Sequence, residues 1–290
     1  MSILKTTNLT HLYGQKTLFE VTAVKNISIE IEEGEFLGVI GHTGSGKSTL
    51  IQHFNGLLKP DSGNVYLDGR DIWESKESVR KARFAVGLCF QYPEYQLFEE
   101  TVYRDISFGP KNMGLAEDEI DRRVQRAARF VGLREELLSK SPFDLSGGEK
   151  RRAAIAGVMA MEPRVLILDE PTAGLDPRGR DTVLGFVKEY RQETGGTVVL
   201  VSHSMDDIAR LATRAVVMNR SEIAMAGTVD EIFSRGGELL EMGLNVPQVT
   251  RIFLDLRGRG LPVSASVYTN EQGEKELLRL FQKGNGGGAQ

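Results

Sequence analysis

The stretch Gly41-His42-Thr43-Gly44-Ser45-Gly46-Lys47-Ser48 decides the fold, because it has the spacing of a phosphate-binding P-loop. Its three glycines allow a tight turn in which consecutive N–H groups can approach a phosphate chain. Lys47 would reach the β- and γ-phosphates, Ser48 would bind Mg²⁺, and a helix from Thr49 onward would direct its positive end at the phosphates. The apolar run 36–40 before the loop is typical of a buried parallel strand, so the segment predicts a nucleotide site.

Size and composition limit the possible functions. The 290 residues suffice for about two domains. The net charge of −4, with no dense basic stripe, argues against nucleic acid as a partner. A single cysteine, Cys89, excludes an intrachain disulfide and a cysteine-based metal site. No apolar run approaches the roughly 20 residues of a membrane-spanning helix and the N-terminus lacks a signal-peptide layout, so we expect a cytoplasmic chain that meets a membrane only through a partner.

Strand and helix signals alternate along most of the chain and predict an α/β fold with a mainly parallel, doubly wound sheet. Strands before the P-loop predict a small antiparallel β subdomain. Helical spacing over 117–131 and a short helix at 133–138 predict a helical subdomain. We therefore expect an ATP-binding core over 1–90 and 145–227, a helical insert over 91–144, and a C-terminal accessory domain over 228–290. That domain should contain helices, an extended piece at 263–267 and a glycine-rich tail from Gly284.

Two further motifs narrow the chemistry. The apolar run 165–168 ends in Asp169 and Glu170, where one carboxylate can hold the hydration shell of Mg²⁺ and the other can deprotonate a water aimed at the γ-phosphate. Ser146 precedes Gly147 and Gly148 at the start of a helical stretch, so it is a natural N-cap beside open N–H groups. This second anion cradle suggests a nucleotide held by another subunit.

These motifs resemble the ATP-binding-cassette (ABC) family, and the resemblance covers the core from Leu4 to about Gly227. It implies that Tyr13 stacks on adenine, that 41–48 is the Walker A loop, and that Gln91 senses Mg²⁺ and the attacking water. It further implies that 145–149 is the signature motif, which acts in trans, that 173–176 faces the partner, and that His203 is the switch histidine. The signature usually ends in glutamine, whereas this chain has Glu149.

The predicted site follows from these assignments. The catalytic residues are Glu170, His203, Gln91 and Lys47, and the Mg²⁺ ligands, partly through water, are Ser48, Gln91 and Asp169. The ATP-binding residues are Tyr13, Gly41, His42, Thr43, Gly44, Ser45, Gly46, Lys47, Ser48 and Thr49, with Ser146, Gly147 and Gly148 supplied to the partner's nucleotide.

The aromatic segment 90–98, followed by Phe108-Gly109-Pro110, is similar to the ATPases of energy-coupling factor (ECF) transporters, including the cobalt and nickel type. The stretch 16–22 resembles the second of two paralogous ATPase types. The resemblance implies an ATP-hydrolysing subunit that acts in a dimer with an identical or paralogous ATPase at the cytoplasmic face of the membrane. It would energise an importer for a vitamin or a transition-metal ion, together with a membrane coupling protein and, indirectly, a substrate-binding membrane protein.

Several alternatives stay open at this point. Tyr13 could be a packed strand residue, His203 a polar group at a strand end, and the aromatics of 92–98 part of the core. A soluble ABC ATPase of DNA repair or translation, or a nucleotide sensor, would share the P-loop. The single cassette without coiled coil, zinc motif or basic surface argues against the first, and Glu170 argues against the sensor.

Overall fold

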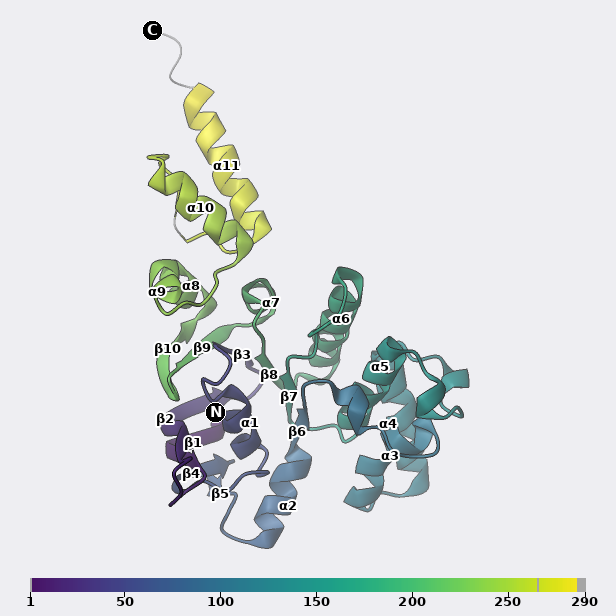
Figure 1. Ribbon diagram of the computed structural model, residues 1–290. Coiled ribbons are helices and arrows are strands. Elements are labelled where there is room, and N and C mark those ends of the chain that lie inside the picture. The colour runs from purple at the N-terminus through teal and green to yellow at the C-terminus, as the bar shows by residue number, and fades with distance from the viewer. Residues whose placement is uncertain (1, 265, 286–290) are drawn as a thin grey trace.

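A central six-stranded sheet forms the middle of the computed structural model, which describes residues 2–264 and 266–285 (Figure 1). Its strand order is β10-β9-β3-β8-β7-β6, and all neighbours are parallel except β9 and β10. Every residue of β3, β7 and β8 is buried, which explains their continuous apolar runs. The strands are β3 (Phe36–Gly41), β6 (Val86–Cys89), β7 (Val165–Asp169), β8 (Thr197–Val201), β9 (Arg214–Asn219) and β10 (Glu222–Thr228).

A second, antiparallel sheet has the order β2-β1-β4-β5. Its strands are β1 (Ser2–Tyr13), β2 (Val21–Glu32), β4 (Ser62–Leu67) and β5 (Arg70–Asp71). Buried residues of this sheet share one apolar cluster with α1 (Lys47–Phe54) and with one face of the central sheet. The P-loop helix is therefore held between the two sheets. The predicted α/β fold, with a mainly parallel sheet and an antiparallel layer, is confirmed.

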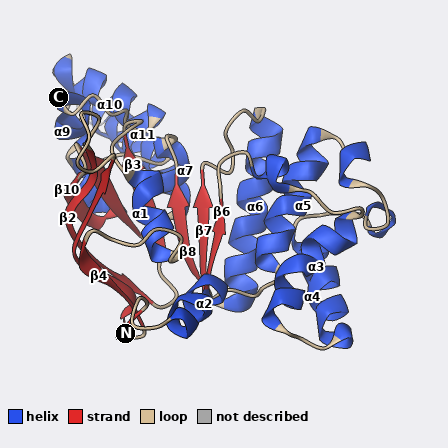
Figure 2. Ribbon diagram, turned by 60° about the horizontal axis from the view of Figure 1, so that its bottom comes forward, coloured by secondary structure: helices blue, strands red, loops and turns tan. Residues whose placement is uncertain are grey.

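The helical part of the molecule lies beside β6 and consists of α3, α4 and α5 (Figure 2). The bounds are α3 (Val102–Met113), α4 (Glu117–Phe130) and α5 (Gly147–Met159), with 3-10 turns η1 (Pro93–Gln96), η2 (Glu135–Leu137) and η3 (Pro142–Asp144). The helix predicted at 133–138 is the shorter turn η2. Helix α5, which follows the predicted insert 91–144 in the chain, packs against α3 and α4.

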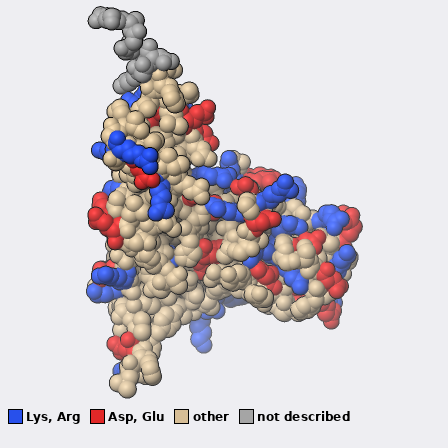
Figure 3. All heavy atoms as spheres, turned by 45° about the horizontal axis from the view of Figure 1, so that its top comes forward, with Lys and Arg blue, Asp and Glu red and all other residues tan. Residues whose placement is uncertain are grey.

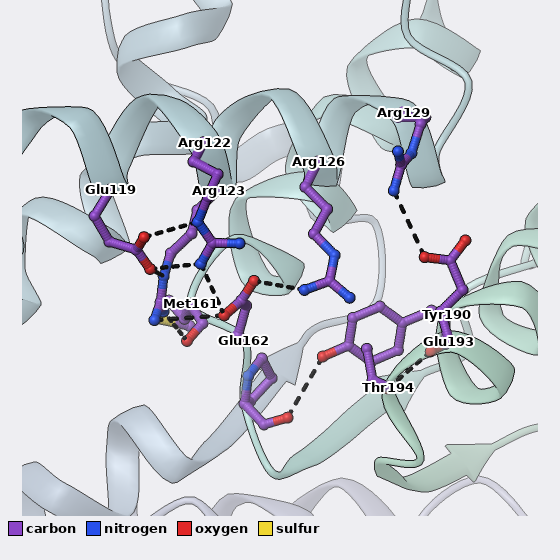
Figure 4. Close-up of polar contacts among 11 residues, drawn as sticks. Glu119, Arg122, Arg123, Arg126, Arg129, Met161, Glu162, Tyr190, Glu193 and Thr194 are labelled. Atoms are coloured by element: carbon purple, nitrogen blue, oxygen red, sulfur yellow. Dashed lines mark hydrogen bonds and ion pairs between the residues drawn. The ribbon is translucent and has the colours of Figure 1, made fainter.

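Arginines of α4 tie this unit to the core (Figure 4). Glu162, in the turn before β7, lies 3.0 Å from Arg126 and 3.4 Å from Arg123, and Arg123 also donates to the carbonyl of Met161. Farther along α4, Arg129 pairs at 3.5 Å with Glu193 of α6 (Pro177–Thr194). These partly exposed ion pairs fix the orientation of α4 more than they stabilise the fold.

The C-terminal residues form two layers. Apolar residues of α8 (Val229–Ser234) and α9 (Gly236–Glu241) belong to the main core cluster, whereas α10 (Gln248–Gly258) and α11 (Asn270–Asn285) enclose a small cluster of their own around Phe253. Positions 263, 264, 266 and 267 form no strand, so the extended piece predicted there is irregular backbone. Helix α11 includes Gly284 and Asn285, and the rest of the predicted tail lies outside the described residues.

The remaining helices are α2 (Lys76–Ala85) and α7 (Met205–Leu211), neither of which the sequence reading singled out. Most of the face drawn in Figure 3 is uncharged, and Lys and Arg side chains lie mixed with Asp and Glu mainly on its right-hand part. Among the described residues, none of the helices combines the length and the apolar character that crossing a bilayer requires.

Candidate functional site

The sheet order brings the predicted catalytic residues together. The neighbouring strands β3, β8, β7 and β6 run parallel, so their carboxyl ends lie along one edge of the sheet. The P-loop follows β3 and His203 follows β8. Asp169 ends β7 with Glu170 directly after it, and Gln91 follows β6. Four segments separated by up to 160 positions therefore face one cavity.

That cavity has a volume of about 370 Å³. Most of the predicted ATP, Mg²⁺ and catalytic residues line it, and so do three residues at the start of β2 that the sequence reading missed. The lining consists of Tyr13, Val21, Thr22, Ala23, Thr43, Gly44, Gly46, Lys47, Ser48, Thr49, Gln91, Asp169, Glu170 and His203. Val21 to Ala23 carry no chemical signature, and only their pairing with β1 could have indicated their position.

The P-loop backbone explains its glycines. Gly46 has φ = 98°, and a Cβ there would lie 2.1 Å from the carbonyl oxygen of Ala23. Gly41 has φ = 154°, and its Cβ would lie 2.4 Å from the carbonyl oxygen of Met218. Helix α1 begins at Lys47 without a side-chain cap, so its first N–H groups are available to an anion. The loop therefore has the backbone geometry that a phosphate-binding loop requires.

The Lys47 side chain folds back onto the P-loop backbone. Its Nζ donates to the carbonyl oxygens of Gly41 and His42, at 2.8 Å each. Burial lowers the pKa of Lys47, and the charges of Glu170 and Asp169 oppose that shift. The ammonium group is therefore poised at the loop, where a phosphate can replace the two carbonyls as its partner.

Ser48 and Asp169 meet on the other side of the P-loop. The Ser48 hydroxyl donates a hydrogen bond to the Asp169 carboxylate. Burial raises the pKa of Asp169, and this hydrogen bond and the charge of Lys47 oppose the rise. Mg²⁺ at a nucleotide site usually takes only one or two protein ligands, because phosphates and water molecules complete its coordination shell. The Ser48 hydroxyl and the Asp169 carboxylate fit that requirement. No cluster of three or more His, Cys, Asp or Glu in the described part of the chain could hold a metal by itself.

Glu170 is held in an unusual backbone conformation. Its φ of 50° lies in the left-handed region, which a non-glycine residue rarely adopts, and its N–H donates to the carbonyl of Val201 at 3.0 Å. Burial raises the pKa of Glu170 to about 7; the neighbouring Asp169 adds to the rise, and the backbone N–H of His203 opposes it. A carboxylate with a pKa near the working pH suits a general base.

His203 lies directly against this carboxylate. Its Nε2 is 3.1 Å from Oε1 of Glu170, and its backbone N–H donates to Oε2 at 3.3 Å. Burial is the main cause that lowers the pKa of His203, and the charge of Lys47 adds to it. This shift favours the neutral imidazole, which can exchange hydrogen bonds with a phosphate and with Glu170.

Two predicted ATP contacts differ in position, because Tyr13 lines the cavity and His42 does not. The Tyr13 ring is 45% exposed, packs edge-on against His11 and holds its hydroxyl 3.4 Å from that of Thr49. This leaves a ring face for a base to stack on. His42 turns away instead, and its Nε2 contacts the carbonyl oxygen of Met242 after α9.

The signature residues occupy a different part of the molecule. Ser146 is the N-cap of α5, as predicted, and together with Glu149 it forms a capping box. A Cβ on Gly147 or Gly148 would have no neighbour within 4 Å. None of Ser146, Gly147 and Gly148 lines the described nucleotide cavity, so the structure does not bring them to the P-loop of their own chain.

Comparison with known proteins agrees with this geometry. The family model of the ABC transporter matches residues 24–173. The chain is 54% identical to the energy-coupling factor transporter ATP-binding protein EcfA2 of Clostridium tetani, over 97% of this chain and 98% of that protein. It is 53% identical to EcfA2 of Clostridium perfringens, over 98% and 100%.

Two solved structures resemble the fold. One is cbiO1 from Clostridium perfringens, described as part of the ABC transporter complex cbiONQ, with a TM-score of 0.73, 39% identity and coverage of 89% of this chain and 97% of that one. The other is the dimeric ATP-binding cassette MJ0796 in a post-hydrolysis state with ADP and Pi, with a TM-score of 0.70, 27% identity and coverage of 78% and 98%. The chain therefore belongs to the ABC transporter ATPases, in the group of the energy-coupling factor transporter ATP-binding proteins.

Proposed function

We propose that the chain binds and hydrolyses ATP in an ATPase dimer and thereby energises an ECF-type importer for a vitamin or a transition-metal ion. One observation carries this proposal. A single cavity collects the phosphate cradle, a buried carboxylate pair, Gln91 and His203, while the signature residues of the same chain lie elsewhere. The cavity thus contains the groups that hydrolysis needs from one subunit, and the signature residues would have to come from a second subunit.

The roles of the residues follow from their positions. Lys47 and the N–H groups of the P-loop bind the phosphates, and Tyr13 stacks on the base. Ser48 and Asp169 would hold Mg²⁺, with Gln91 acting through water. When bound, the ion would neutralise charge on the phosphates of ATP.

Glu170 acts as the base. Its ionised carboxylate accepts a proton from the water that attacks the γ-phosphate, a contribution worth roughly 10²–10⁴-fold in rate. Burial and Asp169 hold its pKa close to neutrality, so it can be ionised before the step and protonated after it. His203 donates a hydrogen bond to the γ-phosphate and reports the state of that phosphate to the dimer.

A second ATPase subunit supplies the signature residues. Its Ser146, Gly147 and Gly148 present N–H groups and a hydroxyl at the start of α5, which suits the γ-phosphate of the facing chain. The dimeric arrangement of the similar cassette MJ0796 supports this reading. An identical chain or a paralogue would serve equally well.

The membrane partner would bind an exposed aromatic surface, which we call the aromatic groove and define as Tyr92, Tyr95, Phe98 and Phe108. Tyr95 is 85% exposed and Phe98 60% exposed, although aromatic rings of this size usually gain free energy by burial. Phe98 and Phe108 form an edge-on pair within this surface. Similarity to proteins named as transporter subunits supports a membrane coupling protein here, with the chain peripheral at the cytoplasmic face and a substrate-binding membrane protein engaged indirectly.

The decisive experiment uses Glu170→Gln. This variant should bind ATP, lose hydrolysis by a factor of about 10² or more, and accumulate as a closed dimer with ATP and Mg²⁺, because it removes the base and a buried charge but keeps the shape. ATP turnover and size-exclusion chromatography measure both effects. Lys47→Ala is the matched control, which should lose ATP affinity itself. Unchanged turnover in Glu170→Gln would refute the assignment of the base.

A further inference from the structure

Arg151 is a charged residue buried in the second turn of α5, just after the signature motif. It is 4% exposed and lies among the helices rather than at the nucleotide. Its Nε and Nη2 donate to the two carboxylate oxygens of Glu94 at 3.0 and 2.7 Å. Its Nη1 donates to the carbonyl oxygen of Ala173 at 2.7 Å. The guanidinium fork is thus shared between two segments that are 79 positions apart in the chain.

The two segments have different tasks. Glu94 belongs to η1, inside the aromatic groove segment that begins directly after Gln91. Ala173 belongs to the loop 170–176, which starts at the catalytic base and leads to Asp176, the N-cap of α6. Tyr92 bridges the same gap, because its ring lies 5.8 Å from the Arg151 guanidinium and its Cε1 is 3.9 Å from where a Cβ on Gly174 would stand. Groove, signature helix and catalytic loop therefore meet at one side chain.

Its chemistry suits a rigid connection. Burial opposes ionisation of Glu94, but the hydrogen bonds and charge of Arg151 outweigh it and lower the pKa of that carboxyl. Other ion pairs near the groove are different in kind: Arg104 and Glu100 form an exposed pair, with side chains 51% and 79% exposed. A planar, bidentate guanidinium also fixes direction, which a lysine ammonium does not.

We infer that Arg151 is a positioning residue that transmits movement between the aromatic groove and the loop 170–176 of the ATPase site. A shift of η1 moves Glu94, and the shared guanidinium carries the shift to the carbonyl of Ala173 and to the start of α5. The inference rests on the proposed function only where it takes the groove as the surface for the membrane partner. The connection itself belongs to the ATPase chain.

Glu94→Gln tests the connection, because it weakens the Glu94–Arg151 pair and leaves unchanged the groups that form the hydrogen bond from Arg151 to the carbonyl oxygen of Ala173. Hydrogen–deuterium exchange of the full-length ATPase should show amides of 172–176 exchanging about fivefold faster or more in Glu94→Gln and in Arg151→Lys. In both variants kcat for ATP should fall about three- to tenfold while KM stays within about twofold, since the phosphate cradle is untouched. Glu100→Gln is the matched control in the exposed pair and should change neither value.

A double variant, Glu94→Leu with Arg151→Leu, separates transmission from simple stabilisation. Replacing both charges by apolar groups should give an unfolding temperature close to that of the wild type, because no unpaired buried charge remains. Exchange at 172–176 and kcat should stay altered. Recovery of all three in the double variant, or unchanged exchange in Glu94→Gln, would overturn the inference. Loss of copurification with a membrane partner would instead concern the proposed function, since none of these measurements uses that partner.

Discussion

His53 shows how one residue can make the fold sensitive to pH. It is fully buried in α1, and its Nδ1 donates to the carbonyl of Thr49 at 2.7 Å. Within the described part of the chain, its Nε2 has no hydrogen-bond partner. Burial lowers the pKa of His53 to about 4, with a small opposing effect from the Thr49 carbonyl. The folded chain therefore keeps this imidazole neutral over a pH range in which the unfolded chain protonates it.

The sign of the effect follows from linkage. A depressed pKa in the folded state contributes stability that is present above the unfolded value of 6.5 and is lost as the pH falls toward 4. Between pH 7.5 and 5, we expect His53 to account for a loss on the order of 2 kcal/mol in the free energy of unfolding. Urea unfolding at both pH values checks this. His53→Leu should show a smaller pH dependence than the wild type, and equal slopes would contradict the prediction.

The contacts of Glu149 explain why a carboxylate is tolerated at the last position of the signature motif. Its Oε2 accepts from the backbone N–H of Ser146 at 2.9 Å and from the Ser146 hydroxyl at 2.6 Å, which completes the capping box. These bonds lower the pKa of Glu149, so the carboxylate is ionised at the positive end of α5. The acid stabilises the helix start, but it also places a negative charge beside Ser146, Gly147 and Gly148, the residues that we propose bind the partner's phosphate.

Glu149→Gln should separate these two effects, because glutamine keeps an acceptor for the capping box and removes the charge. ATP-driven dimerisation, measured in a Glu170→Gln background, should tighten by up to about fivefold, as expected for an exposed charge worth ~0.2–1 kcal/mol. Glu149→Ala is the contrast: it loses the box and should lower folding stability by about 1 kcal/mol. Identical dimerisation of the glutamate and glutamine forms would show that the charge is immaterial.

At the scale of elements, the site is an edge of the central sheet and the groove is a turn beside it. The 3-10 turn η1 follows β6, so Gln91 at the strand end and Tyr95 in the turn lie on one short segment. Asp105 at the start of α3 holds this segment from below by accepting the N–H groups of Phe98 and Glu99. The backbone of the aromatic groove is thus held in place by hydrogen bonds, while its aromatic rings remain exposed.

Replacing Tyr95 and Phe98 together by alanine should leave the ATPase folded and able to bind ATP, because both rings are exposed. Assembly with the membrane partner, or transport if assembly survives, should fall sharply, since aromatic anchors often dominate interface energy. Copurification of the partner measured beside ATP binding distinguishes the cases. Phe143→Ala, which removes a 70% exposed ring in η3, is the control. Full assembly and transport by the double variant would place the partner surface elsewhere.

At the scale of the whole molecule, the C-terminal helices form an extension with its own cluster. An apolar groove of about 370 Å³ lies between α10 and α11, and Ile252, Leu278 and Phe281 on it are 57%, 53% and 67% exposed. In Figure 1 the pair projects from the core beyond α8 and α9. Such a surface suits nucleotide-independent association of two ATPase chains, as expected for an accessory domain.

Deleting all residues after Pro247 should leave a folded, ATP-binding core and weaken association in the absence of nucleotide. Pro247 is the place to cut, because Val246 belongs to the main core cluster whereas Phe253 belongs to the small one. The loss of the stacked Phe233–Tyr268 pair should cost about 1 kcal/mol of stability. Analytical ultracentrifugation without ATP measures association. Full-length chain with Ile252→Ser and Phe281→Ser should behave like the truncation, and unaltered association in both would assign the extension another task.

The sequence 41–48 was enough to predict the phosphate-binding loop, because glycine conformations, a lysine and a hydroxyl act within eight neighbouring positions. Likewise, alternating apolar runs predicted the parallel sheet, and the two carboxylates at 169 and 170 predicted the chemistry at its edge. Which segments meet was decided only by tertiary structure, since strand order is set by packing over the whole sheet rather than by local periodicity. Three placements depend on that packing: Val21 lies in the cavity wall, α5 packs among the helices, and Arg151 lies between Glu94 and Ala173. A contact across 79 or more positions leaves no mark on either of the short segments that make it.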